Sequence, residues 1–218
     1  QAEGPTPDHC CTPIEVQNWK GSIHYTACHV IEIRSVAQLC EIVADPKYPT
    51  PVRAKGSHHS TTKCVVAERG TVLDMTAFNR IQIDEASLTV TMEAGALLID
   101  AAQRLAEKNL QFYVNIELGN LTAGSGACCA TKEASFYSDA AGAYEFGQVS
   151  SYAIGFKAVQ ADGSILIVEE STNASLLPYM RSSYGMLGIV FEVTFRVKQR
   201  RPMAVRHEGY AVHEFAAK

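Results

Sequence analysis

Hydrophobic positions recur along this chain with two different periods. Eight short runs show the alternation, or the unbroken apolar character, that is typical of β-strands. These runs are residues 30–33, 52–54, 71–74, 81–83, 88–92, 153–159, 165–168 and 189–197. Ala161-Asp162-Gly163 lies between the sixth and seventh runs and predicts a hairpin turn there.

Three segments instead have the longer period of helices. The first begins with a capping-box pattern of Ser35 and Gln38 and runs up to Pro46. Residues 97–108 place small and apolar side chains on one face, and residues 173–181 form a shorter helical candidate. Because the first helix lies between the first two strands, the opening unit is β-α-β. The mixture of strands and interleaved helices predicts the α+β class.

Composition narrows the range of functions. The 218 residues are 47% hydrophobic, which suffices for one large core or two smaller lobes. The net charge is −4 with no basic run, which argues against a nucleic-acid surface. No apolar run approaches the roughly 20 residues that span a bilayer, so no membrane partner is expected.

The cysteines and the N-terminus give information on metal binding and on the cellular compartment of the protein. Seven cysteines are an odd number, and their spacing matches neither a zinc ribbon nor a Cys-x-x-Cys site, so no metal is expected. We interpret Cys40, Cys128 and Cys129 as buried thiols that act as small hydrophobes. Residues 1–22 are rich in proline and predict an extended lead-in. The missing start Met suits a removed signal peptide or a fragment boundary, which leaves compartment open but favours a secreted or periplasmic protein over a cytoplasmic one.

Residues 52–60, Val-Arg-Ala-Lys-Gly-Ser-His-His-Ser, are the strongest chemical signal. A short strand ends in a turn in which Gly56 permits tight bending, and successive N–H groups of such a turn form an anion site. Lys55 adds positive charge, and the hydroxyls of Ser57 and Ser60 can donate to phosphate oxygens. Alone, the motif also fits an ordinary surface turn or a chance metal site.

Residues 118–131 contain almost no bulky side chain. A ligand or another segment of the chain can therefore approach this backbone closely, and a helix start here would present bare N–H groups to an anion. The alternative interpretation is a helix packed tightly against a sheet, and the two are compatible. Residues 137–148, which follow, are polar, small and aromatic, and predict a long loop.

Read in order, these blocks resemble the PCMH-type FAD-binding domain of the vanillyl-alcohol-oxidase flavoproteins, nearest to members such as alditol and aldonolactone oxidases. The resemblance runs from about residue 13 to 198. It is carried by residues 52–60, Val-Thr-Met-Glu-Ala-Gly-Ala at 90–96, Leu-Gly-Asn-Leu-Thr at 118–122 with Gly-Ser-Gly-Ala at 124–127, Ala-Val-Gln-Ala-Asp-Gly at 158–163 and Tyr-Gly-Met-Leu-Gly-Ile-Val at 184–190.

The resemblance implies two α+β subdomains with the cofactor between them, within residues 23–200. The smaller lobe would extend to about residue 83 and the larger lobe would follow. The family's FAD contacts match a set of positions in the two glycine loops and one later strand. These are Lys55, Gly56, Ser57, His58, His59, Ser60, Gly119, Asn120, Leu121, Thr122, Gly124, Ser125, Gly126, Thr131, Ala153 and Ile154.

The resemblance also implies a covalent flavin. Many of the aldonolactone-oxidase-like members carry Gly-x-x-His-Ser, and that histidine is joined to the flavin 8α-methyl group. The matching residue here is His59, directly before Ser60, while His58 fills the variable position and is interpreted as a loop contact. A second, cysteinyl bond is not expected, because Ile116-Glu117 occupies the place of that cysteine. Where relatives often read Gly-Thr-His-Gly, this chain has Ala130-Thr131 followed by Lys132, which alters the expected cofactor contacts.

Relatives continue into a substrate domain, of which residues 201–218 resemble only the start. The catalytic residues are therefore unknown from this chain and are expected largely on that cap, which a second chain could supply. We expect an FAD-dependent oxidase that passes hydride from an alcohol, sugar or lactone to flavin N5, with O₂ or another electron acceptor. The alternatives are a flavin-binding electron-transfer subunit of a multi-chain dehydrogenase and a non-catalytic module on a degenerate flavin fold.

Overall fold

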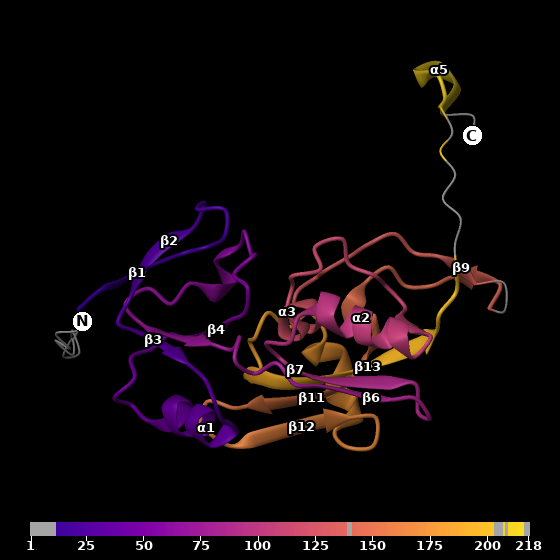
Figure 1. The fold of residues 1–218 in the computed structure, drawn as a ribbon. Helices are drawn as coiled ribbons and strands as arrows, with labels where there is room; N and C mark the ends of the chain where they lie inside the picture. The colour runs from indigo at the N-terminus through magenta and orange to yellow at the C-terminus, as the bar shows by residue number, and fades with distance from the viewer. Residues whose placement is uncertain (1–11, 139–140, 203–206, 208, 216–218) are drawn as a thin grey trace.

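The computed structural model describes residues 12–138, 141–202, 207 and 209–215. Its helices are α1 (Val36–Ala44), α2 (Leu98–Glu107), α3 (Ala123–Cys128), α4 (Leu177–Met180) and α5 (Val212–Phe215). Its strands are β1 (Ile14–Gln17), β2 (His24–Ala27), β3 (His29–Glu32), β4 (Val52–Lys55), β5 (Thr71–Asp74), β6 (Ile81–Asp84), β7 (Thr89–Glu93), β8 (Leu110–Phe112), β9 (Tyr137–Ser138), β10 (Ala143–Tyr144), β11 (Ala153–Val159), β12 (Ile165–Glu169) and β13 (Ile189–Gln199). The elements form two lobes, which lie side by side in Figure 1.

The smaller lobe is built on a parallel sheet with the strand order β3-β5-β4. Successive side chains of β5 face opposite sides of this sheet, as the strand period requires. Leu73 joins a core with Leu39 of α1, whereas Val72 packs with Val16 and Tyr25 of the antiparallel β1–β2 hairpin. The sheet is therefore covered by α1 on one face and by the hairpin on the other.

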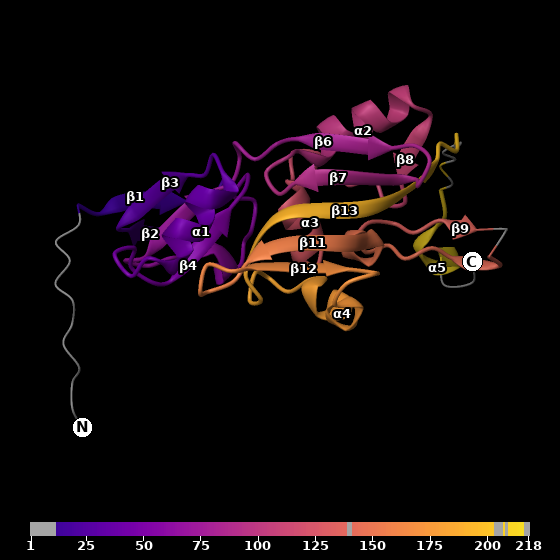
Figure 2. The same ribbon diagram turned by 90° about the horizontal axis from the view of Figure 1, so that it is seen from below.

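The larger lobe is built on an antiparallel sheet with the order β12-β11-β13-β7-β6, and β8 pairs with the far end of β13. Figure 2 shows the long β13 running through the middle of this lobe. The pairing of β11 with β13 shifts register between Lys157 and Ala158. This irregularity lets Phe191 leave the large core and join the core of the smaller lobe, so β13 ties the two lobes together.

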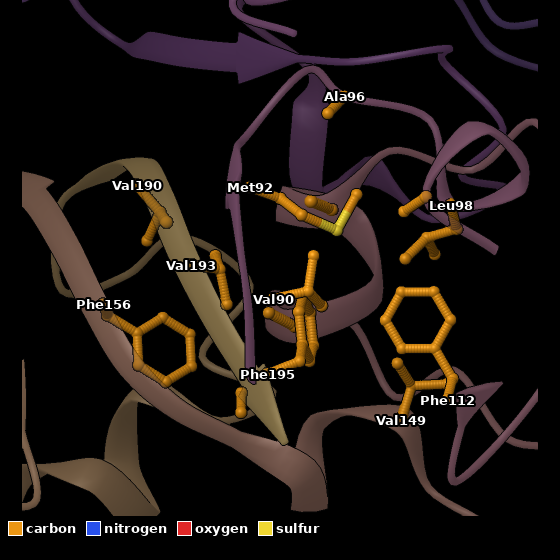
Figure 3. Packing of buried hydrophobic residues seen from close by; sticks show 14 of the residues in the cluster. Val90, Met92, Ala96, Leu98, Phe112, Val149, Phe156, Val190, Val193 and Phe195 are labelled. Atoms are coloured by element: carbon orange, nitrogen blue, oxygen red, sulfur yellow. The ribbon is translucent and has the colours of Figure 1, made fainter. Parts of the chain in front are cut away.

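The main core lies between this sheet and the helices α2, α3 and α4. Phe195 and Phe156 are fully buried in it, and the ring of Phe112 meets that of Phe195 edge to face, with 6.1 Å between centroids. Figure 3 shows these rings among the aliphatic side chains of β7 and β13. A burial pattern of alternating residues on one face confirms the strand periodicity predicted for residues 88–92 and 189–197.

The α+β class and all eight predicted strands are confirmed. The predicted helix at Ser35 is also confirmed, because the Ser35 hydroxyl accepts a hydrogen bond from the backbone N–H of Gln38. The second bond of the capping box differs from the expected one. The Gln38 side chain accepts from the backbone N–H of Arg34 rather than from that of Ser35. Residues 173–181 form a 3₁₀ turn followed by the short α4.

Three sequence expectations need correction. Residues 14–17, placed in the extended lead-in, form β1, because they pair with β2 across a turn at Gly21; residues 1–11 lie outside the described part of the chain. β6 pairs with β7 of the large sheet, so the border between the lobes precedes residue 81 rather than following residue 83. The predicted long loop at 137–148 contains the β9–β10 pair.

Two further observations concern the chain as a whole. Among the described residues, no helix combines the length and the apolar character that crossing a bilayer requires. Of the three cysteines interpreted as buried thiols, Cys128 is buried, whereas Cys40 and Cys129 are only half-buried. The exposure of Cys129 follows from its place at a cleft, described next.

Candidate functional site

A cleft separates the two lobes and consists of two adjoining hollows. The first has a volume of about 110 Å³ and the second about 270 Å³. Both are lined by Gly56 and Val65 from the smaller lobe and by Ser125, Cys129 and Tyr184 from the larger lobe. Because these residues are shared, the hollows form one continuous cleft with a wall from each lobe.

The loop that follows β4 forms the wall of the smaller lobe, and the turn of the β1–β2 hairpin holds it from behind. Trp19 donates from its backbone N–H to the carbonyl of His58 and from its indole Nε1–H to the carbonyl of His59, each at 3.0 Å. Asn18 donates from Nδ2 to the carbonyl of Ser60, also at 3.0 Å. Three consecutive carbonyl groups of this loop are thus directed toward the hairpin.

The N–H groups on the opposite side of those peptides have no partner among the described residues. In a planar trans peptide the carbonyl of one residue and the N–H of the next point in opposite directions. The N–H groups of His59, Ser60 and Thr61 therefore point away from the hairpin, and all three residues line the second hollow. Within the described residues, these three groups donate no hydrogen bond. Such a row of N–H groups forms a nest for an anion, which fits the pyrophosphate of FAD.

Asn18 fixes this loop, and its removal tests the arrangement. Asn18 is 2% exposed, donates to Ser60 and to Ser22 Oγ, and accepts from Ile23 N–H. We expect Asn18→Ala to lower the free energy of unfolding by about 2 kcal/mol, because it leaves buried backbone groups unsatisfied. Denaturant unfolding measures this change. Trp19→Phe serves as the milder comparison, because it keeps an aromatic ring and loses only the exposed hydrogen bond from the indole N–H to the carbonyl of His59. Equal stability of the wild type and Asn18→Ala would contradict the proposed role of Asn18 in holding the loop.

The two adjacent histidines differ in backbone conformation and in the aromatic ring that each contacts. His59 lines the second hollow, its ring lies 5.2 Å from that of Trp19, and its Nδ1 is buried without a hydrogen-bond partner among the described residues. His58 has φ 59°, and its ring faces Tyr25 of the hairpin. Burial, with the positive charge of Lys55, lowers the pKa of His58, so this ring is neutral at pH 7. His58 also lines the second hollow, and its Nε2, like Nδ1 of His59, is buried without a hydrogen-bond partner among the described residues.

Two of the polar side chains predicted to contact phosphate, Lys55 and Ser57, are engaged within the protein. Lys55 forms an ion pair with Asp74, which compensates its positive charge. Burial opposes ionisation of Asp74, but hydrogen bonds from Lys55 and Thr76 outweigh it and keep the pKa of that carboxyl below its usual value. Ser57 Oγ donates to the carbonyl of Asn120 across the cleft at 2.7 Å. The backbone N–H groups of this wall are therefore freer to meet an anion than these side chains are.

Ser60 also has partners within its own loop. Its Oγ lies 3.0 Å from Thr62 Oγ1 and 3.2 Å from Cys64 Sγ, and it accepts a hydrogen bond from the backbone N–H of Thr62. This network closes the loop just before the short 3₁₀ helix Lys63–Val65. The hydroxyl predicted to donate to phosphate therefore stabilises the loop.

The wall of the larger lobe is the start of α3. Thr122 caps this helix by accepting from the N–H of Ser125. The N–H groups of Ala123 and Gly124 donate to the carbonyls of Ala96 and Ala94, at 2.8 and 2.9 Å. The expectation of bare N–H groups at this helix start is therefore wrong, because the link between β7 and α2 pairs with them. The small residues instead allow α3 to pack closely against its neighbours, as the alternative interpretation has it.

Of the remaining residues predicted to contact FAD, some line the cleft and others do not. Leu121, Thr122, Gly124, Ser125 and Thr131 line the cleft together with the loop of the smaller lobe. Asn120 contributes only the carbonyl that Ser57 contacts. The other four do not line either hollow and stay predictions for FAD contacts: Gly119, Gly126, Ala153 and Ile154.

Several cleft residues were missed by reasoning from the sequence. Asn18 and Trp19 act through long-range contacts of the unpredicted hairpin, and no local signal marked them. Tyr184 lines both hollows, and its position in the Tyr-Gly-Met-Leu-Gly block was available as a signal. Cys64 lines the first hollow, and neither its spacing nor its neighbours distinguished it from other thiols.

Two curated proteins are similar in sequence to most of this chain. L-gulonolactone oxidase of Mus musculus is 24% identical over 185 residues, covering 84% of this chain and 40% of that protein. L-gulono-1,4-lactone dehydrogenase of Mycobacterium tuberculosis is 26% identical over 181 residues, covering 82% and 40%. The chain thus spans about 40% of the length of these curated relatives.

The fold has solved counterparts. The crystal structure of 6-hydroxy-D-nicotine oxidase from Arthrobacter nicotinovorans superposes with a TM-score of 0.63, at 18% identity, over 78% of this chain and 36% of that one. A family model described as the FAD binding domain matches residues 27–169, which is more than half of the chain. The chain therefore belongs to this family of FAD binding domains, which confirms the resemblance to the vanillyl-alcohol-oxidase flavoproteins predicted from its sequence.

Proposed function

We propose that this chain is the FAD-binding part of a flavin-dependent oxidoreductase, in which FAD is attached through His59. The proposed reaction takes hydride from a C–H of an alcohol, sugar or lactone to flavin N5 and passes the electrons to O₂ or another acceptor. The relatives named for gulonolactone oxidation and dehydrogenation support a small polar substrate of this kind. Substrate binding and proton abstraction are assigned to a cap domain, in the same protein or in a second chain.

One observation carries the proposal. In the described part of the chain, the N–H groups of His59, Ser60 and Thr61 donate no hydrogen bond, and they belong to the hollow that also holds the unsatisfied ring nitrogens of His58 and His59. An anion alone would account for the N–H groups, whereas a larger cofactor that carries a pyrophosphate accounts for both features. Buried side-chain nitrogens without a partner are uncommon in folded proteins, so the ring nitrogens at this hollow, next to a row of free N–H groups, support a ligand there.

The residues of the cleft have distinct proposed roles. The N–H groups of the loop hold the pyrophosphate, Trp19 and Asn18 keep those groups oriented, and Thr122 and Ser125 form the facing wall. FAD supplies the redox chemistry when bound, and the protein supplies position and electrostatics. The ion pair of Lys55 with Asp74 keeps the smaller lobe rigid beside the loop and leaves little net charge there.

The proposal is tested by the absorption spectrum of the purified protein before and after incubation with FAD and gel filtration. We expect flavin absorbance that elutes with the protein. Riboflavin, which lacks the pyrophosphate, is the matched control and is expected to be retained at least about tenfold more weakly, because charge-assisted hydrogen bonds to the N–H nest are lost. A protein that stays colourless with FAD would overturn the proposal and favour a non-catalytic module on this fold.

A further inference from the structure

Two free thiols come together at the cleft from opposite lobes. Cys64 lies in the 3₁₀ helix Lys63–Val65 of the smaller lobe, and Cys129 is the C-cap residue of α3 in the larger lobe. Both are half-buried, and both line the first hollow, from which a small molecule can reach them. The proposed function uses neither of them.

The surroundings of Cys64 favour its thiolate. Thr62 donates from Oγ1 to Cys64 Sγ at 3.1 Å, and Ser60 Oγ lies 3.2 Å from the same sulfur. The adjacent thiol of Cys129, followed by these two hydroxyls, lowers the pKa of Cys64 to about 5, although burial opposes this. The same contact raises the pKa of Cys129, with burial adding to the effect. These surroundings favour the thiolate at Cys64 and the protonated thiol at Cys129.

The neighbouring Cys128 does not share these properties. It is buried, and burial raises its pKa to about 12. Its thiol is therefore protonated and shielded at neutral pH. Cys40, on α1, is half-buried but lines neither hollow of the cleft. Among the described free cysteines, the conditions for thiol chemistry meet only at the pair.

We propose that Cys64 and Cys129 are a redox-active dithiol that forms a reversible disulfide across the flavin cleft. The oxidant is a low-molecular-weight disulfide such as glutathione disulfide. The Cys64 thiolate attacks one sulfur of that disulfide and releases one thiol, which leaves a mixed disulfide on Cys64. Cys129 then loses its proton and attacks the Cys64 sulfur, which releases the second thiol. Two protein thiols are oxidised and one small disulfide is reduced to two thiols.

The bond would join the two walls covalently. One sulfur belongs to the loop region that follows the N–H nest, and the other follows α3 directly. The disulfide therefore holds the lobes at a fixed separation and slows entry and exit of a ligand at the cleft. It also closes a long chain loop, which stabilises the folded state by constraining the unfolded one.

The test treats the purified, flavin-free protein with glutathione disulfide and maps disulfides by mass spectrometry of peptides. We expect a peptide pair joined through Cys64 and Cys129 and a rise of roughly 5–10 °C in melting temperature, both reversed by dithiothreitol. The Cys64→Ser and Cys129→Ser variants are expected to lose the linkage and the stabilisation. Cys40→Ser is the control, and it should form the linkage as wild type does.

Other outcomes would overturn the proposal. They include a stable glutathione adduct on Cys64 with no intramolecular bond, a linkage between Cys128 and Cys129, or no reaction at either residue. Mapping on the wild-type protein decides between them even where a variant fails to fold. Because this readout needs no flavin, it is independent of whether the protein binds FAD.

A second readout concerns the cleft. In protein that binds FAD, we expect the oxidised form to take up FAD at least about tenfold more slowly than the reduced form, since the walls can no longer separate. If the disulfide has formed and both forms take up FAD at the same rate, the proposed effect on entry to the cleft is wrong, although the disulfide itself is established.

Discussion

Replacing His59 with alanine is expected to abolish the covalent attachment of flavin completely. The wild-type protein, denatured with acid, should retain yellow colour in the precipitate. His59→Ala should release all its flavin to the supernatant, because no other side chain is proposed to hold the cofactor covalently. The N–H nest should persist in the variant, since the Trp19 and Asn18 bonds to this loop reach backbone carbonyls. FAD therefore still binds, but reversibly.

His58 offers a matched control for this result. Its φ of 59° lies in the left-handed region, which asparagine tolerates better than most residues, so His58→Asn removes an imidazole without straining the loop. We expect His58→Asn to keep its flavin through acid precipitation. Release from both variants would point to a disturbed loop rather than to loss of the attachment atom. Retention in His59→Ala, or release from the wild type, would remove His59 from its proposed role and leave FAD binding intact.

Local sequence patterns were sufficient for most of the fold. The strands at 88–92 and 189–197 were predictable because one face of each is buried and the alternation is therefore visible in the sequence. The helix at Ser35 was predictable because its cap is made by residues three apart. Such signals lie within a few residues of the element that they describe. The ordered glycine blocks then identified the family that the comparisons show.

What escaped prediction depends on contacts distant in the chain. β1 has only four residues, and its pairing with β2, together with the bonds from Asn18 and Trp19 to the loop after β4, gives it its place. The helix start at Thr122 carried the expected small residues, yet the carbonyls of Ala94 and Ala96, far back in the sequence, use its N–H groups. A sequence pattern can predict a donor or a charge, but not whether the fold already supplies its partner. Lys55 and Ser57 illustrate the same limit, because Asp74 and Asn120 engage them.

The second large effect is expected for Gly56→Ala, at a position where the two walls of the cleft lie close together. A Cβ at Gly56 would lie 2.4 Å from Thr122 Oγ1 and 2.7 Å from Thr122 Cγ2. Thr122 is 2% exposed and its hydroxyl caps α3, so it has no room to turn away. The walls must therefore separate at the point where Ser57 bridges them. Overpacking of this kind costs about 1–3 kcal/mol, and this cost, taken from the FAD-bound arrangement of the walls, corresponds to a loss of affinity of roughly 5- to 150-fold.

The measurement is a titration with FAD, followed by flavin fluorescence, in the His59→Ala background, where binding is reversible. Thr122→Gly removes the atoms that collide and is tolerated at a helix cap, at a cost of a few tenths of a kcal/mol. We expect the Gly56→Ala/Thr122→Gly pair to recover most of the affinity that Gly56→Ala loses. Additive losses in the double variant would show that Gly56 matters for another reason, such as the conformation of the loop itself. Recovery would establish that contact between the two walls sets the width of the cleft and, through it, the affinity for the cofactor.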